Sequence, residues 1–199
     1  MGHTRTKGDR GQLFVVSGPS GSGKSTLSRE AVRRTGASLS ISTTTRSPGP
    51  SEVNGKDYTF ISKEKFIEKI NQNEFLEYAE VFGHYYGTPA TTVHQKIEAG
   101  QTIVLEIDVQ GAKQVFSRYP NAIGILIVPP NTEELHRRLN QRGRDNVETM
   151  KKRLEKAQWE IDQAKVDLHF KHTIINDHLE QAIEELGTII ESKNETMCQ

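Results

Sequence analysis

The chain has 199 residues, which is enough for one well-buried core with small inserted lobes and too short for many domains. Lysine plus arginine and aspartate plus glutamate number 26 each, so no overall charge directs the protein to nucleic acid or to a membrane surface. The mean hydropathy of −0.63 and the lack of an apolar run near 18 residues exclude a membrane-spanning helix. A single cysteine, Cys198, allows no internal disulfide, and we expect a cytoplasmic protein.

The predicted elements alternate along the chain between short apolar strands and helical patterns with apolar residues three and four positions apart. This alternation predicts an α/β fold with a parallel sheet and crossover helices. The predicted strands cover residues 13–16, 39–41, 102–107, 123–128 and 173–175, and the predicted helices cover residues 26–34, 64–72, 133–140, 148–166 and 179–191.

Two segments interrupt this alternation. Residues 42–88 are polar and contain several prolines, glycines and tyrosines, and residues 131–153 are dense in arginine. Such segments favour lobes that extend from the core to meet ligands. The predicted organisation is a loose N-terminal tail (1–11), a core domain (12–41, 89–130 and 154–191), a lobe (42–88), an arginine-rich lid (131–153) and a loose C-terminal tail (192–199).

The segment after the first predicted strand reads GPSGSGKS at residues 18–25 and fits the P-loop pattern G-x-x-x-x-G-K-[ST]. Its glycines let backbone N–H groups converge on phosphate oxygens, which a Cβ at those positions would obstruct. Lys24 adds a positive charge toward the β- and γ-phosphates, and the Ser25 hydroxyl suits a Mg²⁺ ion. The pattern predicts a nucleoside triphosphate at the N-terminus of the following helix. The predicted triphosphate-binding residues are Gly18, Pro19, Ser20, Gly21, Ser22, Gly23, Lys24, Ser25 and Thr26.

The chain favours a kinase over a switch GTPase. A GTPase carries a base-reading [NT]-K-x-D motif downstream of its P-loop, whereas TKGD stands upstream here, at residues 6–9. A kinase whose acceptor is itself a phosphate needs no general base, because a phosphate monoester with a second pKa of about 6 is largely a dianion at pH 7. It needs cations around two mutually repelling phosphates. The arginines within 137–153 would supply them, and a solvated basic helix face is the alternative explanation.

The lobe predicted at 42–88 contains residue types that suit a nucleoside monophosphate with a guanine base. Arg46 and the tyrosine hydroxyls suit a phosphate monoester. A carboxylate such as Glu77 accepts hydrogen bonds from the N1–H and N2–H₂ edge of guanine. Adenine would leave a buried carboxylate unpaired, and sites built in this way discriminate by about 10⁴–10⁵. Strand alternation predicts that only one of Tyr85 and Tyr86 faces the ligand.

With these motifs in this order, the chain resembles the guanylate kinases of bacterial type from about Gln12 to about Ile190. The motifs that carry the resemblance are SGPSGSGKST, STTTRSPGPSEVNGKDY, EFLEYAEVFGHYYGT, LEIDVQGA, RLNQRGRD and IIND. The resemblance implies a P-loop NTPase three-layer fold, with the lobe at 42–88 binding GMP and the segment 131–153 acting as a lid. It also implies Mg²⁺-dependent transfer of the γ-phosphoryl group of ATP to GMP, giving GDP and ADP.

The resemblance assigns a role to each matching residue. Guanine recognition falls to Ser42, Glu77 and Asp108, with Thr88 nearby, and the GMP phosphate falls to Arg46, Tyr58 and Tyr86. Charge neutralisation during transfer falls to Lys24, Arg46, Arg138, Arg142 and Arg153. Asn176 matches a position near the adenine of ATP, and Ser25, with Glu106 acting through water, matches the Mg²⁺ site.

The chain departs from the family pattern at two positions. The family's acceptor loop usually carries a second arginine on the GMP phosphate, and this chain has Gly49 there. We hypothesise that Lys56 or a cation of the tail or lid partly compensates, or that GMP is held more loosely. The strand before the QG dipeptide commonly carries aspartate where this chain has Glu106, whose longer side chain would alter the placement of Mg²⁺ or water near Ser25.

Two other functions remain as alternatives. One is a non-catalytic guanylate-kinase-like interaction domain, although the P-loop of this chain is intact. The other is a P-loop kinase that acts on a different phosphorylated acceptor. The expected partners are the small molecules ATP and GMP, with dGMP as a further acceptor, and no nucleic acid or membrane. The sequence neither requires nor excludes a homodimer.

Overall fold

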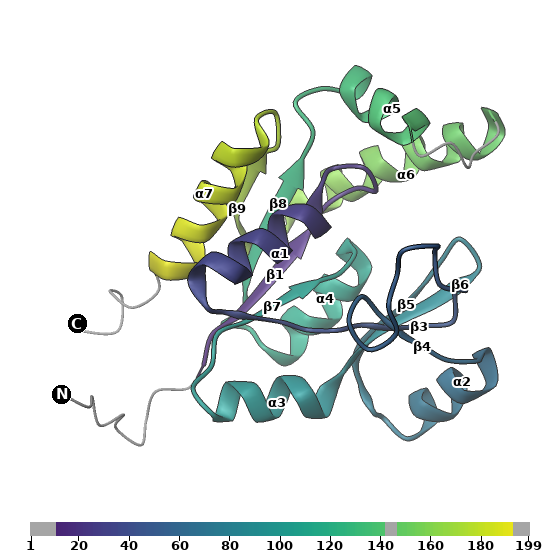
Figure 1. Ribbon diagram of the computed structural model, residues 1–199, viewed down its shortest axis with the longest axis vertical. Helices are drawn as coiled ribbons and strands as arrows, with labels where there is room; N and C mark the ends of the chain where they lie inside the picture. The colour runs from purple at the N-terminus through teal and green to yellow at the C-terminus, as the bar shows by residue number, and fades with distance from the viewer. Residues whose placement is uncertain (1–10, 142–146, 193–199) are drawn as a thin grey trace.

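The computed structural model describes residues 11–141 and 147–192. Its centre is a five-stranded parallel sheet with the strand order β2-β7-β1-β8-β9 (Figure 1). The predicted α/β fold with a parallel core sheet is therefore confirmed. The strands of this sheet are β1 (Leu13–Ser17), β2 (Ser38–Leu39), β7 (Ile103–Glu106), β8 (Ile123–Val128) and β9 (Phe170–Ile175).

Helices cover both faces of the core sheet, which gives three layers. Along β1, Leu13 and Val15 pack with α3 and α4, whereas Phe14 and Val16 pack with α1 and α7. Successive strand residues point to opposite faces, so an unbroken apolar run such as 13–16 suits a strand that is buried on both sides. The covering helices are α1 (Lys24–Thr35), α3 (Ala90–Glu98), α4 (Val109–Arg118), α6 (Val147–Val166) and α7 (Leu179–Glu191).

A second, four-stranded sheet with the order β4-β3-β6-β5 forms the lobe beside the core (Figure 1). Its helix α2 (Lys63–Asn71) buries Phe66 against Phe75 and Tyr85, with ring centroids 4.4 and 5.5 Å apart. The sequence predicted a polar lobe here but not its sheet. The strands are β3 (Thr43–Thr44), β4 (Thr59–Phe60), β5 (Phe75–Val81) and β6 (His84–Pro89).

Most predicted elements lie where they were expected, within a few residues. Helices α3 and α4 were not predicted, and the predicted strand at 39–41 is instead the two-residue β2. Helix α5 (Thr132–Gln141) and the start of α6 lie in the predicted lid, but α6 continues without a break past its boundary at residue 153. The predicted tails fall mainly on residues 1–10 and 193–199, which lie outside the described residues, as does Arg142 of the lid. Within the described ranges, no helix combines the length and apolar character needed to cross a bilayer.

Candidate active site

The P-loop follows β1 and leads into α1, as the sequence predicted. Gly18 has a φ of 142°, and a Cβ there would lie 2.1 Å from the carbonyl oxygen of Ile127. Gly23 has a φ of 92°, and a Cβ there would lie 2.2 Å from Nδ2 of Asn176. Only glycine satisfies both the backbone conformation and the close contact at these positions. The loop therefore depends on the glycines for its packing as well as for phosphate access.

Lys24 is folded back over this loop. Its Nζ donates hydrogen bonds to the carbonyl oxygens of Gly18 (2.6 Å) and Pro19 (2.9 Å). The ammonium group is thus held beside the backbone that would cradle the phosphates, close to where the motif predicts the β- and γ-phosphates.

The end of β9 supports the P-loop from the other side. The buried Asn176 donates from Nδ2 to the carbonyl oxygen of Ser22 (2.8 Å), and Arg138 donates from Nη2 to the carbonyl oxygen of Asn176 (2.9 Å). Arg138 also pairs with Glu134 at 2.6 Å. Asn176 and Arg138 border a side hollow together with Gly21, Gly23 and Thr26. Asn176 and Arg138 therefore lie together, apart from the cavity in front of Lys24.

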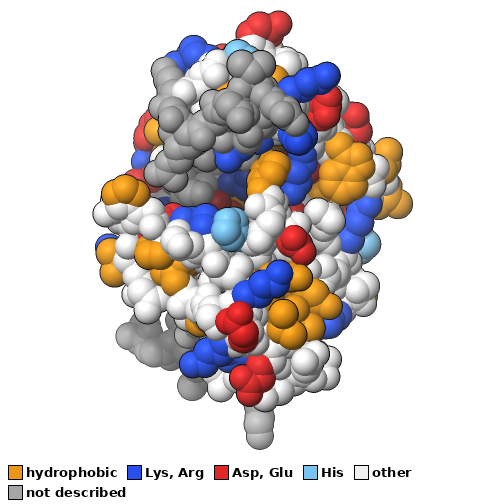
Figure 2. All heavy atoms as spheres, turned by 90° about the vertical axis from the view of Figure 1, so that its right-hand side faces the viewer, with side chains coloured by type: hydrophobic (Ala, Val, Ile, Leu, Met, Phe, Trp, Pro, Cys, Tyr) orange, Lys and Arg blue, Asp and Glu red, His pale blue; other side chains and the backbone are white. Residues whose placement is uncertain are grey.

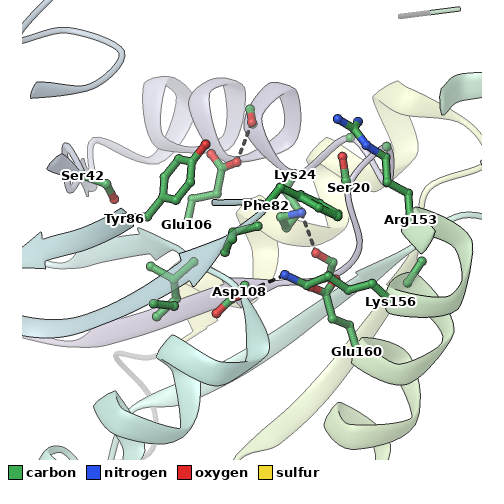
Figure 3. Close-up of a pocket in the computed structure, with 18 of the residues that line it drawn as sticks. Ser20, Lys24, Ser42, Phe82, Tyr86, Glu106, Asp108, Arg153, Lys156 and Glu160 are labelled. Atoms are coloured by element: carbon green, nitrogen blue, oxygen red, sulfur yellow. Dashed lines mark hydrogen bonds and ion pairs between the residues drawn. The ribbon is translucent and has the colours of Figure 1, made fainter. Parts of the chain in front are cut away.

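A principal cavity of about 310 Å³ joins the P-loop to the lobe. Figure 2 views the molecule from this side and shows a hollow with lysine and arginine side chains near its rim. The lining brings together most residues predicted from the sequence, and Figure 3 shows several of them pointing toward one another. The predicted residues that line it are Gly18, Ser20, Gly21, Gly23, Lys24, Ser25, Thr26, Ser42, Tyr58, Glu77, Tyr86, Glu106, Asp108 and Arg153.

Ser25 and Glu106 meet at the start of α1. Ser25 Oγ donates a hydrogen bond to Glu106 Oε1 at 2.5 Å. Mg²⁺ prefers oxygen ligands and is commonly held by one or two protein groups together with substrate phosphates and water. No cluster of three or more His, Cys, Asp or Glu ligands occurs among the described residues. The Ser25–Glu106 pair supplies oxygen atoms of this kind, so it suits an ion that nucleotide phosphates also hold.

Glu77 is the most buried carboxylate of the cavity, with 3 % of its surface exposed. The Thr88 hydroxyl donates to it at 2.6 Å, so Thr88 lies behind Glu77 and does not line the cavity. A Cβ on Gly111 would lie 2.3 Å from Glu77 Oε2, so glycine at that position makes room for the carboxylate. Burial raises the pKa of Glu77 to about 7, and the nearby Asp108 adds to the rise.

Asp108 faces the same end of the cavity from the N-terminus of α4. Its Oδ1 accepts a hydrogen bond from the N–H of Gly111 at 2.9 Å and caps the helix. The cap fixes the direction of the carboxylate. Glu77 and Asp108 therefore present two acceptors toward one region, as hydrogen-bond recognition of a base edge requires.

Of the predicted phosphate-binding residues, Tyr58 and Tyr86 line the principal cavity with Glu77, and Arg46 lines the hollow beside it. Arg46 forms two hydrogen bonds to Glu52, at 2.8 and 2.9 Å, and this contact raises the pKa of its guanidinium further. Burial raises the pKa of Tyr58 to about 12, so its hydroxyl remains a proton donor at neutral pH. The rings of Tyr58 and Tyr86 are 6.1 Å apart.

A larger outer hollow, of about 650 Å³, adjoins the principal cavity and is lined by Arg46, Lys56, Tyr58, Tyr86 and Arg153, among others. Of the tyrosine pair, Tyr86 lines both hollows whereas Tyr85 packs on Phe66, which confirms the predicted alternation.

Of the lining residues that were not predicted as site residues, three are aromatic or charged. Phe82 comes from the turn between β5 and β6, and Lys156 and Glu160 come from α6. Glu160 is 5 % exposed, and burial raises its pKa to about 7, while the charges of Lys24 and Lys156 oppose the rise. Their spacing from Arg153, by three and seven residues, places them on one helix face, which was the available signal in the sequence.

Comparison with known proteins agrees with this geometry. The family model for guanylate kinase matches residues 10–193. Curated guanylate kinases from Clostridium tetani, Thermus thermophilus and Neisseria meningitidis are 42 %, 45 % and 47 % identical, covering 93 %, 92 % and 91 % of this chain and 88 %, 81 % and 87 % of their own lengths. The crystal structure of guanylate kinase from Anaplasma phagocytophilum superposes with a TM-score of 0.79 at 29 % identity, covering 96 % of this chain and 89 % of that one. The chain belongs to the guanylate kinase family.

Proposed function

We propose that this chain transfers the γ-phosphoryl group of ATP to GMP, giving ADP and GDP. The observation that carries the proposal is the principal cavity, in which the phosphate-cradling loop and Lys24 face the carboxylates of Glu77 and Asp108. A donor triphosphate on the loop and a guanine base beside the carboxylates would place the two phosphates between them. Such a reaction depends on positioning and charge neutralisation.

At the guanine end, Glu77 and Asp108 would accept hydrogen bonds from the N1–H and N2–H₂ edge, and Ser42 lines the same cavity. At the phosphate end, Arg46 and the protonated Tyr58 would donate hydrogen bonds to the acceptor phosphate, together with Tyr86. No residue needs to remove a proton, because the acceptor is already a dianion at neutral pH. The negative charge of the phosphoryl group during transfer would be stabilised by Lys24, Arg46, Arg138, Arg142 and Arg153.

Ser25 and Glu106 would hold Mg²⁺ with the donor phosphates, where the ion would neutralise charge on the transferred group. The longer Glu106 side chain reaches the Ser25 hydroxyl directly, which supports the expected role of this pair. We include dGMP in the proposal as a further acceptor. We also propose that α5 and the start of α6 form a lid, and that the protein is cytoplasmic.

The test is ADP formation from ATP and Mg²⁺ with GMP, dGMP, AMP, UMP or CMP as acceptor. We expect kcat/KM with GMP to exceed that with AMP by at least about 10³-fold, because adenine lacks the N1–H and N2–H₂ donors that guanine would offer to the buried carboxylates. Lys24→Ala should lower the GMP-dependent rate by at least about a hundredfold. The matched control is Lys65→Ala on the exposed surface of α2. Equal rates with AMP would contradict guanine recognition, and ADP formation that does not depend on any acceptor would contradict the kinase.

A further inference from the structure

Helix α6 presents a row of ionisable side chains to the principal cavity. Arg153, Lys156 and Glu160 are three and four residues apart, so they share one helix face, and all three line the cavity (Figure 3). Arg153 is expected from the family pattern, but the other two are not assigned a role by the motifs of the sequence. Lys156 is the cation of the row that reaches the guanine end.

Lys156 lies between two carboxylates. Its Nζ is 3.8 Å from Asp108 Oδ2 and 3.7 Å from Glu160 Oε1, and its side chain is 23 % exposed. Figure 3 shows it extending from α6 toward Asp108. At 3.8 Å the contact with Asp108 is electrostatic and longer than a hydrogen bond. The Oδ2 atom accepts a long hydrogen bond from Gln110 Nε2 (3.4 Å) and keeps a further lone pair that a base N–H can approach, while Oδ1 accepts the hydrogen bond that caps α4.

The tip of the lobe helps to fix the ammonium group. Phe82 and Gly83 join β5 to β6 and have φ values of 51° and 80°, the positive pair that a tight two-residue hairpin turn requires. The turn presents the Phe82 ring to α6, where Lys156 Nζ lies 5.1 Å from its centroid and the Arg153 guanidinium lies 5.2 Å from it. Cations at these distances are attracted to the ring face. Phe82 thus helps to restrain the ammonium group of Lys156.

The guanine end would repel an anionic nucleotide without a nearby cation. Asp108 raises the pKa of both Glu77 and Glu160, which means that the three carboxyl groups interact electrostatically. GMP carries a phosphate dianion into the same cavity. A positive charge between Asp108 and Glu160 offsets part of this repulsion, because the interaction of partly buried charges is weakly screened.

We propose that Lys156 is a positioning residue for the monophosphate substrate: its ammonium group offsets the charge of Asp108 and Glu160 and holds Asp108 Oδ2 turned toward the guanine edge. The inference rests on the proposed function, since it assumes that guanine binds beside Asp108. Lys156 acts through Asp108 and touches no reacting atom. It should therefore affect the binding of GMP more than the binding of ATP or the rate of transfer.

The test compares Lys156→Gln with Lys151→Gln, which removes the same charge from an exposed position of the same helix. We expect Lys156→Gln to weaken GMP binding, measured by titration calorimetry, and to raise the KM for GMP, each by about fivefold. The KM for ATP and kcat should stay within about twofold, and Lys156→Arg should restore GMP binding because it keeps the charge. Lys151→Gln should change none of these quantities.

A double-mutant cycle tests whether Lys156 affects GMP binding through Asp108. Asp108→Asn keeps an acceptor for the Gly111 N–H but removes the charge, so Lys156→Gln should change GMP affinity by less than about twofold in that background. An unchanged or tighter Kd in Lys156→Gln would overturn the inference, and so would an equal loss in the Asp108→Asn background or an equal rise in the KM for ATP. These outcomes are distinct from failure of the proposed function, which would show as wild-type protein without GMP-dependent ADP formation.

Discussion

At the scale of the residue, Glu77 combines a recognition role with a cost to the fold. The side chain is almost completely buried, and its partner among the described hydrogen bonds is the Thr88 hydroxyl at 2.6 Å. Burial disfavours the carboxylate more than the neutral acid, which raises the pKa of Glu77 from an ordinary value of 4.5 to about 7. The group that guanine recognition needs as an acceptor is thus harder to ionise in the folded protein than in the unfolded chain.

This difference makes stability depend on pH in a defined direction. Between pH 4.5 and 7 the unfolded chain loses the Glu77 proton while the folded protein keeps it, so the free energy of unfolding falls as the pH rises through that window. A shift of this size corresponds to about 3 kcal/mol. Glu77→Gln cannot ionise, so its stability relative to wild type should be higher at pH 8 than at pH 5 by a large part of that amount.

Urea unfolding of both proteins at pH 5 and pH 8 measures the effect. Glu98→Gln, at an exposed position on α3, is the control and should show the same difference from wild type at both pH values. A Glu77→Gln difference that is independent of pH would show that burial does not perturb this carboxyl group.

At the scale of the element, the loop between β3 and β4 has Gly49 where the family pattern usually has a second arginine, and its contacts orient Arg46 in another way. Glu52 accepts both hydrogen bonds from Arg46 and a further one from the Gly49 N–H at 2.6 Å. The position that would carry a cation instead supplies a backbone donor to the carboxylate that orients Arg46. Lys56 borders the same outer hollow, in keeping with the hypothesis that it compensates.

Gly49→Arg should therefore tighten the grip on GMP. A Cβ at this position would lie 3.1 Å from Glu52 Oε2, a contact that a small movement of the flexible carboxylate relieves. The new guanidinium would add a charge-assisted hydrogen bond to the phosphate, and we expect the KM for GMP to fall about fivefold with kcat nearly unchanged. Steady-state kinetics with Gly49→Ala as the control separates the charge from the effect of adding a Cβ. A KM for GMP that does not fall, or that falls equally in the alanine variant, would contradict a loosened phosphate grip.

The elements also show which features the sequence could predict. The run 13–16 and the glycines of 18–23 have strong local patterns, so β1, the P-loop and α1 were predicted closely. Strands β3 and β4 are two residues long and leave no periodicity to read. The longer strands β5 and β6 were also missed, because their residues were interpreted as polar ligand-binding segments of the lobe. Lys156 lies on the predicted helix 148–166, but its role depends on α6 facing the lobe, which is a property of tertiary structure.

At the scale of the whole molecule, the core and the lobe meet at β5, where Leu76 of the lobe is buried in the same apolar cluster as Val93 and Ile97 of α3. The core sheet is covered on both faces, whereas the lobe packs its own sheet on α2 around Phe66. Described contacts between them include the ion pair of Arg29 with Asp57 at 2.6 Å and the hydrogen bond from Arg118 to the carbonyl oxygen of Phe75 at 3.0 Å. Such polar contacts stabilise little individually. Because Leu76 anchors β5 to the core, we propose that α2 and β6 of the predicted lobe (42–88) open independently of the predicted core (12–41, 89–130 and 154–191).

Native-state hydrogen exchange measures this independence directly. Amides of β1, β7 and β8 should exchange only through global unfolding, whereas amides of α2 and β6 should exchange through a smaller opening of the lobe. Leu186→Ala, on the buried face of α7, should lower the free energy of exchange of the core strands by about 2–5 kcal/mol and leave the amides of α2 and β6 unchanged. Phe66→Leu should have the reverse pattern, because Phe66 is fully buried in the lobe. If either substitution accelerated exchange equally in both regions, the molecule would unfold as one cooperative unit and the proposed division would be wrong.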